Sequence, residues 1–350
     1  MRLAGGPGST IGSVPADTVP AAARPALAWL LFPAPAAMRR IAGAGVLANA
    51  GIIMTGAAVR LSQSGLGCPD WPDCTARSLV AAPTRGDPLI HTWIEFGNRL
   101  VTVLVMAVAV AVTIAAWRYR PAGARRRGIV WLALAQPLGV VAQAVLGGIV
   151  VLTKLDPIWV SVHFVLSSAV LALAVVLWTR CAEGDAPARR LVRADLRVLS
   201  IAVVPVVAVM LAVGTVVTGT GPLAGAAGTP RYHLPLAGVT QLHADIGWVL
   251  GTLSAVLAVC LQLTGAPLRA RRLGWLLLGL VGVQGMIGYS QYFSGLPAGL
   301  VWVHVTGSVL IWIVALRLMF ATRDRGPVIP AAAAPAAAGA TADSVVASQP

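Results

Sequence analysis

The apolar residues of this chain are gathered into long runs with few polar interruptions. Eight segments contain 18 or more mostly apolar residues, each long enough to cross a hydrocarbon core ~30 Å thick. Because backbone groups in lipid must pair within the chain, we predict that each segment is an α-helix. The predicted membrane-spanning helices are residues 39–59, 91–117, 128–152, 158–179, 198–217, 241–263, 273–291 and 298–320.

The composition agrees with a membrane protein. Hydrophobic residues make up 57% of the chain and charged residues only 11%, with a mean hydropathy of +0.82. A soluble globular domain carries about 25% charged residues. The sequence therefore predicts an all-α integral membrane protein.

The positive charges are concentrated in alternate connections between the predicted helices. The net charge is +14, and most arginines fall within residues 39–40, 118–127, 180–197, 269–272 and 317–325. The connections 60–90, 153–157, 218–240 and 292–297 hold few basic residues. Cytoplasmic loops of membrane proteins carry this excess of Lys and Arg, so we expect a multi-pass protein of the cell membrane with both termini cytoplasmic. The same placement argues against nucleic acid as a partner.

The two ends of the chain differ from the middle in composition. Residues 1–37 are rich in Ala, Pro and Gly, and residues 326–350 in Ala, Pro, Ser and Thr. Neither has an apolar stretch with the shape of a signal peptide. We expect both to be disordered cytoplasmic tails.

The chain contains an internal repeat. Gln143 lies 20 residues before His163, and Gln284 lies 20 residues before His304, within similar surroundings. An even number of spans returns the chain to its starting side, so the copies are parallel. We predict two pseudo-symmetric four-helix bundles, residues 38–182 and 183–325.

Four of the five histidines take matching places in the outer parts of the even-numbered predicted helices: His91, His163, His243 and His304. Two histidines on facing helices of a bundle can hold a haem iron between them. In three cases a small residue follows one turn later on the same helix face and leaves room for a flat ring: Ser167, Gly247 and Ser308. The alternatives are hydrogen-bonded core histidines and ordinary helix packing. We expect His233, in a polar loop, to be solvated.

The second predicted helix is unusually polar. Glu95 stands one turn after His91, and Asn98 and Thr102 continue the same stripe. A carboxylate inside a membrane helix is costly and indicates function. The alternatives for Glu95 are an ion pair with Arg99 or a buried hydrogen bond, and Arg99 is also suited to a haem propionate. The other intramembrane acid, Asp245, lies on a different face from His243.

Two cysteines lie in the first outer loop, within the stretch SGLGCPDWPDC. On the oxidising side of the membrane, Cys68 and Cys74 favour a disulfide that fixes this loop over the first bundle. Metal binding by the pair is the alternative. We expect Cys181 and Cys260 to be ordinary thiols.

Several stretches together, spanning about residues 40–322, resemble the heme A synthase family, of the type found in actinobacteria. They are TGAAVRLSQSGLGCPDWPDC, IEFGNRLVT, QAVLGGIVVLTKLDPIWVSVHF, QLHAD and GLPAGLVWVHVTGS. The resemblance implies an enzyme that oxidises the C8 methyl group of heme O to the formyl group of heme A, for cytochrome oxidase. The oxidation would be stepwise, through an alcohol and a hydrated aldehyde, with oxygen from water. Heme O synthase and cytochrome oxidase assembly would be its partners.

The resemblance also implies roles for particular residues. A heme b cofactor would have His243 and His304 as axial ligands, and heme O would bind near His163, with Glu95 as the catalytic residue. Many members have a histidine where this chain has Asn98. Either His91, two turns earlier on the same face, takes over as ligand, or the iron is held on one side only, by His163. The alternative function is a diheme electron-transfer cytochrome b, which would leave Glu95 without a task.

Overall fold

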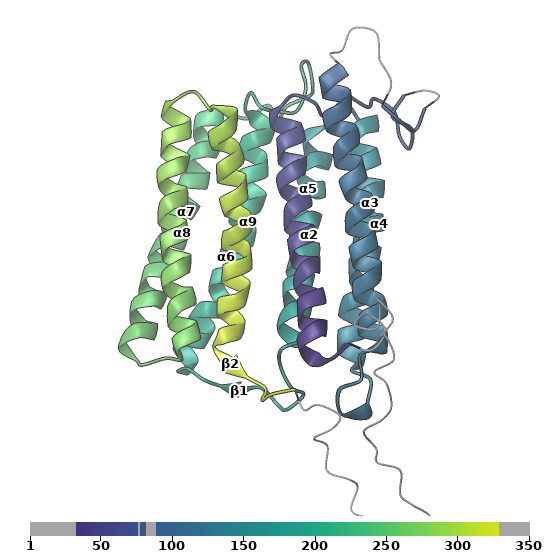
Figure 1. The fold of residues 1–350 in the computed structure, drawn as a ribbon. Helices are drawn as coiled ribbons and strands as arrows, with labels where there is room; N and C mark the ends of the chain where they lie inside the picture. Colours follow the sequence, from purple (N-terminus) through teal and green to yellow (C-terminus); the bar gives the residue numbers. More distant parts are fainter. Residues whose placement is uncertain (1–32, 76–77, 82–88, 329–350) are drawn as a thin grey trace, which may run out of the picture.

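The computed structural model describes residues 33–75, 78–81 and 89–328, and eight long helices run through these residues (Figure 1). They are α2 (Pro35–Leu61), α3 (Leu89–Arg118), α4 (Arg127–Leu152), α5 (Pro157–Arg180), α6 (Ala194–Thr220), α7 (Leu236–Leu263), α8 (Leu268–Phe293) and α9 (Ala298–Ala321). All eight are long and apolar enough to cross a membrane. The predicted all-α fold is confirmed, and the protein is a multi-pass membrane protein.

Most helices are longer than their apolar cores. Helix α8 begins at Leu268 rather than at residue 273, and its first turn contains Arg269, Arg271 and Arg272. The predicted spans end at the first charged residues. The helices themselves continue past these residues, because their backbone hydrogen bonds can also form at the membrane surface. Pro267 directly precedes α8, and the lack of a backbone N–H on proline suits the start of a helix.

The helices pack as two rings of four. In the first ring, α2 contacts α3, α3 contacts α4, α4 contacts α5, and α5 contacts α2. Helices α6, α7, α8 and α9 repeat the same order of contacts. The rings meet where α5 packs against α6 and α9, and where α2 packs against α9. This arrangement is compatible with the predicted pair of four-helix bundles.

The two rings share one apolar core. Its largest buried cluster includes Ile53 of α2, Leu171 of α5, Leu257 of α7 and Leu277 of α8. Two tryptophans of α9 add hydrogen bonds across the boundary: Trp302 Nε1 donates to the carbonyl of Met54 at 2.9 Å, and Trp312 Nε1 donates to that of Ser168 at 2.8 Å. The rings are therefore parts of one folded unit.

Two outer turns show the repeat in the backbone. Lys154 and Leu155, between α4 and α5, have φ of 54° and 62°; Gly295 and Leu296, between α8 and α9, have φ of 78° and 60°. Non-glycine residues rarely adopt positive φ. Each pair stands 141 positions from its counterpart in the chain, as Gln143 does from Gln284. The two turns therefore agree with the predicted repeat.

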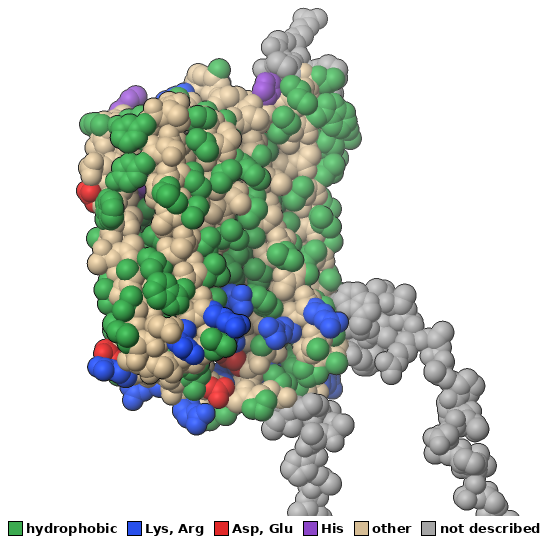
Figure 2. All heavy atoms as spheres, turned by 60° about the vertical axis from the view of Figure 1, so that its left-hand side comes forward, with side chains coloured by type: hydrophobic (Ala, Val, Ile, Leu, Met, Phe, Trp, Pro, Cys, Tyr) green, Lys and Arg blue, Asp and Glu red, His purple; other side chains and the backbone are tan. Residues whose placement is uncertain are grey.

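Arginines gather at one end of the molecule, the lower end in Figure 2. There the buried Arg126, which directly precedes α4, donates to the carbonyls of Arg180 and Gly184 and to the Asp185 carboxylate. Strands β1 (Arg189–Arg190) and β2 (Arg323–Asp324) pair antiparallel nearby. These contacts attach the connection between the rings to the segment that follows α9. The predicted tails fall almost entirely on residues 1–32 and 329–350, outside the described residues.

Candidate functional site

A cavity of about 1590 Å³ extends through both rings toward the outer end and is lined by all eight long helices. Pockets for single small molecules measure roughly 300–1,000 Å³. The cavity therefore has room for more than one ligand of that size. His163, His243 and His304 all line it, as do Glu95 and Asn98.

In the second ring two histidines face each other. The rings of His243 on α7 and His304 on α9 lie 6.2 Å apart between centroids, at 61°. The Nδ1 atom of each is buried without a hydrogen-bond partner. Imidazole binds metals at ~2 Å, so two rings on opposite sides of one metal atom stand at about this separation. The pair fits a haem iron with two axial histidines.

A glycine of a neighbouring helix faces each of these rings. A Cβ on Gly214 of α6 would lie 3.2 Å from His243 Cε1, and one on Gly288 of α8 would lie 3.4 Å from His304 Cε1. In the first ring, a Cβ on Gly147 of α4 would lie 3.5 Å from the same atom of His163. The sequence analysis missed these glycines. The repeat could have predicted two of them, because Gly147 and Gly288 are separated by the same 141 positions as the histidines that they face.

The first ring holds His163 together with a glutamine. Gln143 Nε2 donates to the backbone carbonyl of His163 at 3.1 Å and to Ser167 Oγ at 2.5 Å. The Nδ1 atom of His163 is buried and has no hydrogen-bond partner. Gln143 thus fixes the turn of α5 that carries the histidine, and the imidazole keeps its nitrogens for a ligand.

Glu95 is buried beside the cavity, with 6% of its surface exposed. One carboxylate oxygen accepts a hydrogen bond from the backbone N–H of Cys68 at 2.8 Å, and the other accepts from Arg99 at 2.9 Å. The ion pair that the sequence left open is therefore present. Through Arg99, the ion pair connects Glu95 to the disulfide loop, residues 62–75. Glu95 still lines the cavity.

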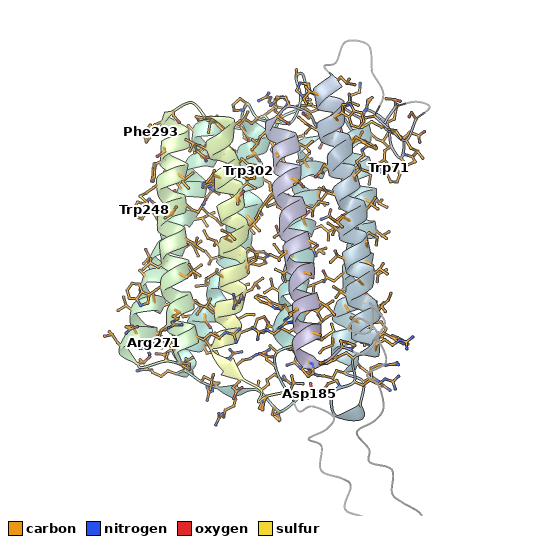
Figure 3. The ribbon with its side chains drawn as sticks, in the orientation of Figure 1. Trp71, Asp185, Trp248, Arg271, Phe293 and Trp302 are labelled. Atoms are coloured by element: carbon orange, nitrogen blue, oxygen red, sulfur yellow. A yellow bond between two sulfur atoms is a disulfide. The ribbon has the colours of Figure 1, made fainter. Side chains whose placement is uncertain are left out.

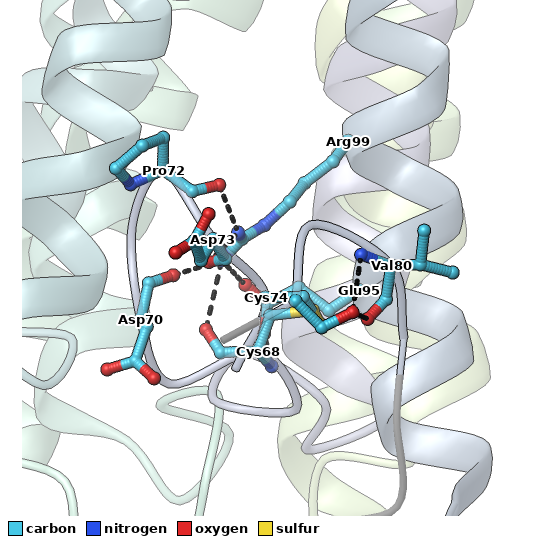
Figure 4. The surroundings of a disulfide bond; sticks show 9 residues. Cys68, Asp70, Pro72, Asp73, Cys74, Val80, Glu95 and Arg99 are labelled. Atoms are coloured by element: carbon cyan, nitrogen blue, oxygen red, sulfur yellow. Dashed lines mark hydrogen bonds and ion pairs between the residues drawn. A yellow bond between two sulfur atoms is a disulfide. The ribbon is translucent and has the colours of Figure 1, made fainter. Parts of the chain in front are cut away.

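Arg99 is held by the disulfide loop (Figure 4). Its guanidinium donates to the carbonyls of Cys68 at 2.9 Å, Asp70 at 3.0 Å and Asp73 at 2.8 Å, with a longer contact of 3.5 Å to Pro72. These bonds, with the one to Glu95, use both terminal nitrogens. The propionate contact considered for Arg99 would have to compete with them.

His91 and Asn98 lie in different surroundings. His91 is absent from the cavity lining, and its Nδ1 lies 2.8 Å from Ser64 Oγ. Asn98 lines the cavity and accepts a hydrogen bond from Thr55 at 2.7 Å. A Cβ on Gly56 would lie 4.0 Å from Asn98 Nδ2, much as one on Gly214 would face His243. Asn98, rather than His91, therefore stands at the structural counterpart of His243.

The predicted disulfide between Cys68 and Cys74 is confirmed. Cys181 and Cys260 are free. Cys181 lies just beyond α5, and burial raises the pKa of its thiol to about 12. Asp245 is exposed on the outside of α7, where Gln241 donates to it at 2.7 Å, so it lies away from the histidine pair.

The fold and cavity define a multi-pass membrane protein with a facing histidine pair in one ring and a histidine with a buried acid in the other. The COX15-CtaA model of cytochrome oxidase assembly proteins matches residues 39–316, and the chain belongs to this family. The heme A synthase of Shewanella oneidensis is 24% identical over 317 aligned residues, which cover 77% of this chain and 92% of that protein. The heme A synthase of Geobacillus thermodenitrificans is 36% identical over 106 residues, 30% of each chain.

Proposed function

We propose that this protein is a heme A synthase, which oxidises the C8 methyl group of heme O to a formyl group. The observation that carries the proposal is the difference between the two rings of helices. The second ring offers His243 and His304 without an acid in contact. The first ring offers His163 together with the buried carboxylate of Glu95. One site is suited to a resident haem, and the other to a haem that undergoes reaction.

In the second ring, His243 and His304 would hold heme b through its iron. Heme b supplies one-electron redox chemistry when bound. The chain contributes the two imidazoles, and Gly214 and Gly288 leave room beside them. An apolar surrounding, with Leu250 and Ile311 in the cavity wall, excludes water from the pair.

In the first ring, His163 would bind the substrate heme O, and Asn98 lines the same cavity. Glu95 is the catalytic residue, because its carboxylate lies at the cavity wall with a fixed orientation. It takes up a proton or stabilises positive charge that develops at the methyl carbon. Arg99 holds this carboxylate in place through the hydrogen bond between the two side chains. His91, which bonds Ser64, serves the outer loop.

The oxidation takes its oxygen from water and passes through an alcohol to a hydrated aldehyde, which loses water. The electrons leave to an acceptor outside the chain. Because cytoplasmic loops carry an excess of Lys and Arg, the arginine-rich end would face the cytoplasm of a cell membrane, with both termini on that side. Heme O synthase would supply the substrate, and cytochrome oxidase assembly would take the product.

The test is a pigment analysis. The chain is produced together with a heme O source in a host without its own heme A, and the haems are extracted and separated. New heme A is the expected result. Unchanged heme O, from protein that carries haem bound by histidines, would overturn the proposal in favour of a diheme electron-transfer cytochrome.

A further inference from the structure

One aromatic side chain of the disulfide loop reaches the cavity of the first ring. Trp71 lines the cavity together with Pro72, and 40% of its surface is exposed. It is labelled in Figure 3 near the upper end of the first ring. Its indole lies directly on Gly148 of α4. A Cβ added to Gly148 would come within 2.5–2.9 Å of three ring atoms, closer than real side chains approach one another. The glycine is therefore required for this position of the ring.

Arg99 fixes the backbone on both sides of this tryptophan. It donates to the carbonyl of Asp70, the residue before Trp71, and contacts that of Pro72, the residue after it. The same guanidinium holds Glu95. The indole and the acid are therefore positioned by one side chain.

The second ring also has an aromatic side chain at the cavity, but it comes from a helix. The counterpart of Gly148, 141 positions further along the chain, is Tyr289 of α8. Tyr289 also lines the cavity, and its hydroxyl accepts a hydrogen bond from Trp248 Nε1 at 3.1 Å. One ring thus has its aromatic group built into a helix, and the other receives it from a loop. A cofactor that stays bound can be enclosed by helices alone. A substrate must enter and leave, and an aromatic side chain on a loop can move aside for it.

We propose that Trp71 is a wall of the heme O site, and that Arg99 and Gly148 are the residues that position it. This inference rests on the proposed function and assigns the substrate contact within it. The flat indole offers an apolar face to the porphyrin, and aromatic faces pack favourably on other flat rings. Removal of the loop from Gly148 would open the first ring without disturbing His243 and His304.

The test is a titration of purified protein, already carrying heme b, with heme O, followed by absorbance. We expect Trp71→Ala to weaken heme O binding at least ~5-fold, the scale of a lost aromatic contact, and Trp71→Phe to restore most of it. Gly148→Ala should weaken binding in the same direction, because the added methyl group displaces the indole. The matched control is Gly128→Ala at the start of the same helix, where a Cβ meets nothing within 4 Å. Heme b content should equal that of the parent in all four variants.

The double variant Trp71→Ala with Gly148→Ala separates positioning from general damage. If Gly148 acts through Trp71, the double variant binds heme O no more weakly than Trp71→Ala alone. Additive losses would overturn the role of Gly148, and parental affinity in Trp71→Ala would overturn the role of the tryptophan. Either result in a protein that still makes heme A leaves the proposed function intact, whereas a parent that makes none defeats that function itself.

Discussion

At the scale of single residues, the ion pair of Glu95 with Arg99 is compatible with catalysis. A carboxylate has about four lone-pair sites, and the hydrogen bonds from Cys68 and Arg99 occupy two of them. Glu95 also lines the cavity. The pair thus orients the acid and leaves it able to accept a proton.

Replacement of Glu95 by Gln keeps the size of the side chain and removes its charge. We expect heme A formation to fall at least ~10-fold, the scale of a lost acid–base contribution. Heme b should stay bound, because His243 and His304 lie on other helices. Haem extraction measures both quantities, and alkylation of unreduced protein checks that the Cys68–Cys74 bond is intact. A variant with heme b, the disulfide and the parental rate would return Glu95 to a structural role.

The facing histidines give a second prediction. If the pair holds heme b as proposed, His243→Ala or His304→Ala removes one of its two iron ligands, and tightly bound heme b should be lost from the purified protein. His233→Ala is the control, since His233 is exposed in the loop before α7. The measurement is haem per protein by pyridine haemochrome. Full haem content in both cavity variants would show that the pair does not hold heme b.

Cys181 gives a prediction about pH. Burial raises the pKa of this thiol to about 12, so at pH 8 it is protonated and unreactive, since the thiolate is the nucleophile. We expect iodoacetamide at pH 8 to leave Cys181 unmodified in native protein. After reduction and denaturation, Cys68, Cys74 and Cys181 should all be modified. Peptide mass spectrometry counts the labels, and rapid labelling of Cys181 at pH 8 would contradict the burial.

At the scale of elements, the sequence predicted the features that depend on residues close together in the chain. Apolar runs long enough to span lipid located all eight helices, and the Gln143 and Gln284 surroundings located the repeat. The match of His91 to His243 rested on position along the helix alone. It could not foresee that the first turns of α3 pack against the disulfide loop, where a Cβ on Gly67 would collide with the backbone of His91. Asn98, and not His91, aligns with His243 only when the contacts of Gly56 with Asn98 and of Gly214 with His243 are compared.

One buried arginine contributes several of the contacts that hold the connection between the rings. Only 9% of Arg126 is exposed, and it holds two carbonyls and the Asp185 carboxylate. We expect Arg126→Ala to cost about 1.5–3 kcal/mol, the range for hydrogen bonds to a charged group, and to lower the thermal unfolding midpoint. Asp185→Asn should cost less than about 1 kcal/mol, because 66% of the Asp185 side chain is exposed. Equal midpoints for the two variants would contradict this ranking.

At the scale of the whole molecule, the two rings share their core but differ at their sites. The common core and the Trp302 and Trp312 hydrogen bonds make them one unit. Within it, the first ring has a disulfide, and it brings a buried acid and a loop tryptophan to the cavity. The two rings thus have the same order of helix contacts, and the disulfide loop accounts for much of the difference between their sites.

The last prediction concerns how many haems the molecule binds. The cavity of about 1590 Å³ exceeds what one small ligand needs, and its histidines belong to different rings. Protein made without heme O should therefore carry one heme b and accept one further haem on titration with heme O. His163→Ala should lose the second haem and keep the first, whereas His304→Ala should lose the first. Haem-to-protein ratios, with extracted haems separated by chromatography, give both counts. Loss of both haems from His163→Ala in protein of unchanged helicity would mean that the two sites do not bind independently.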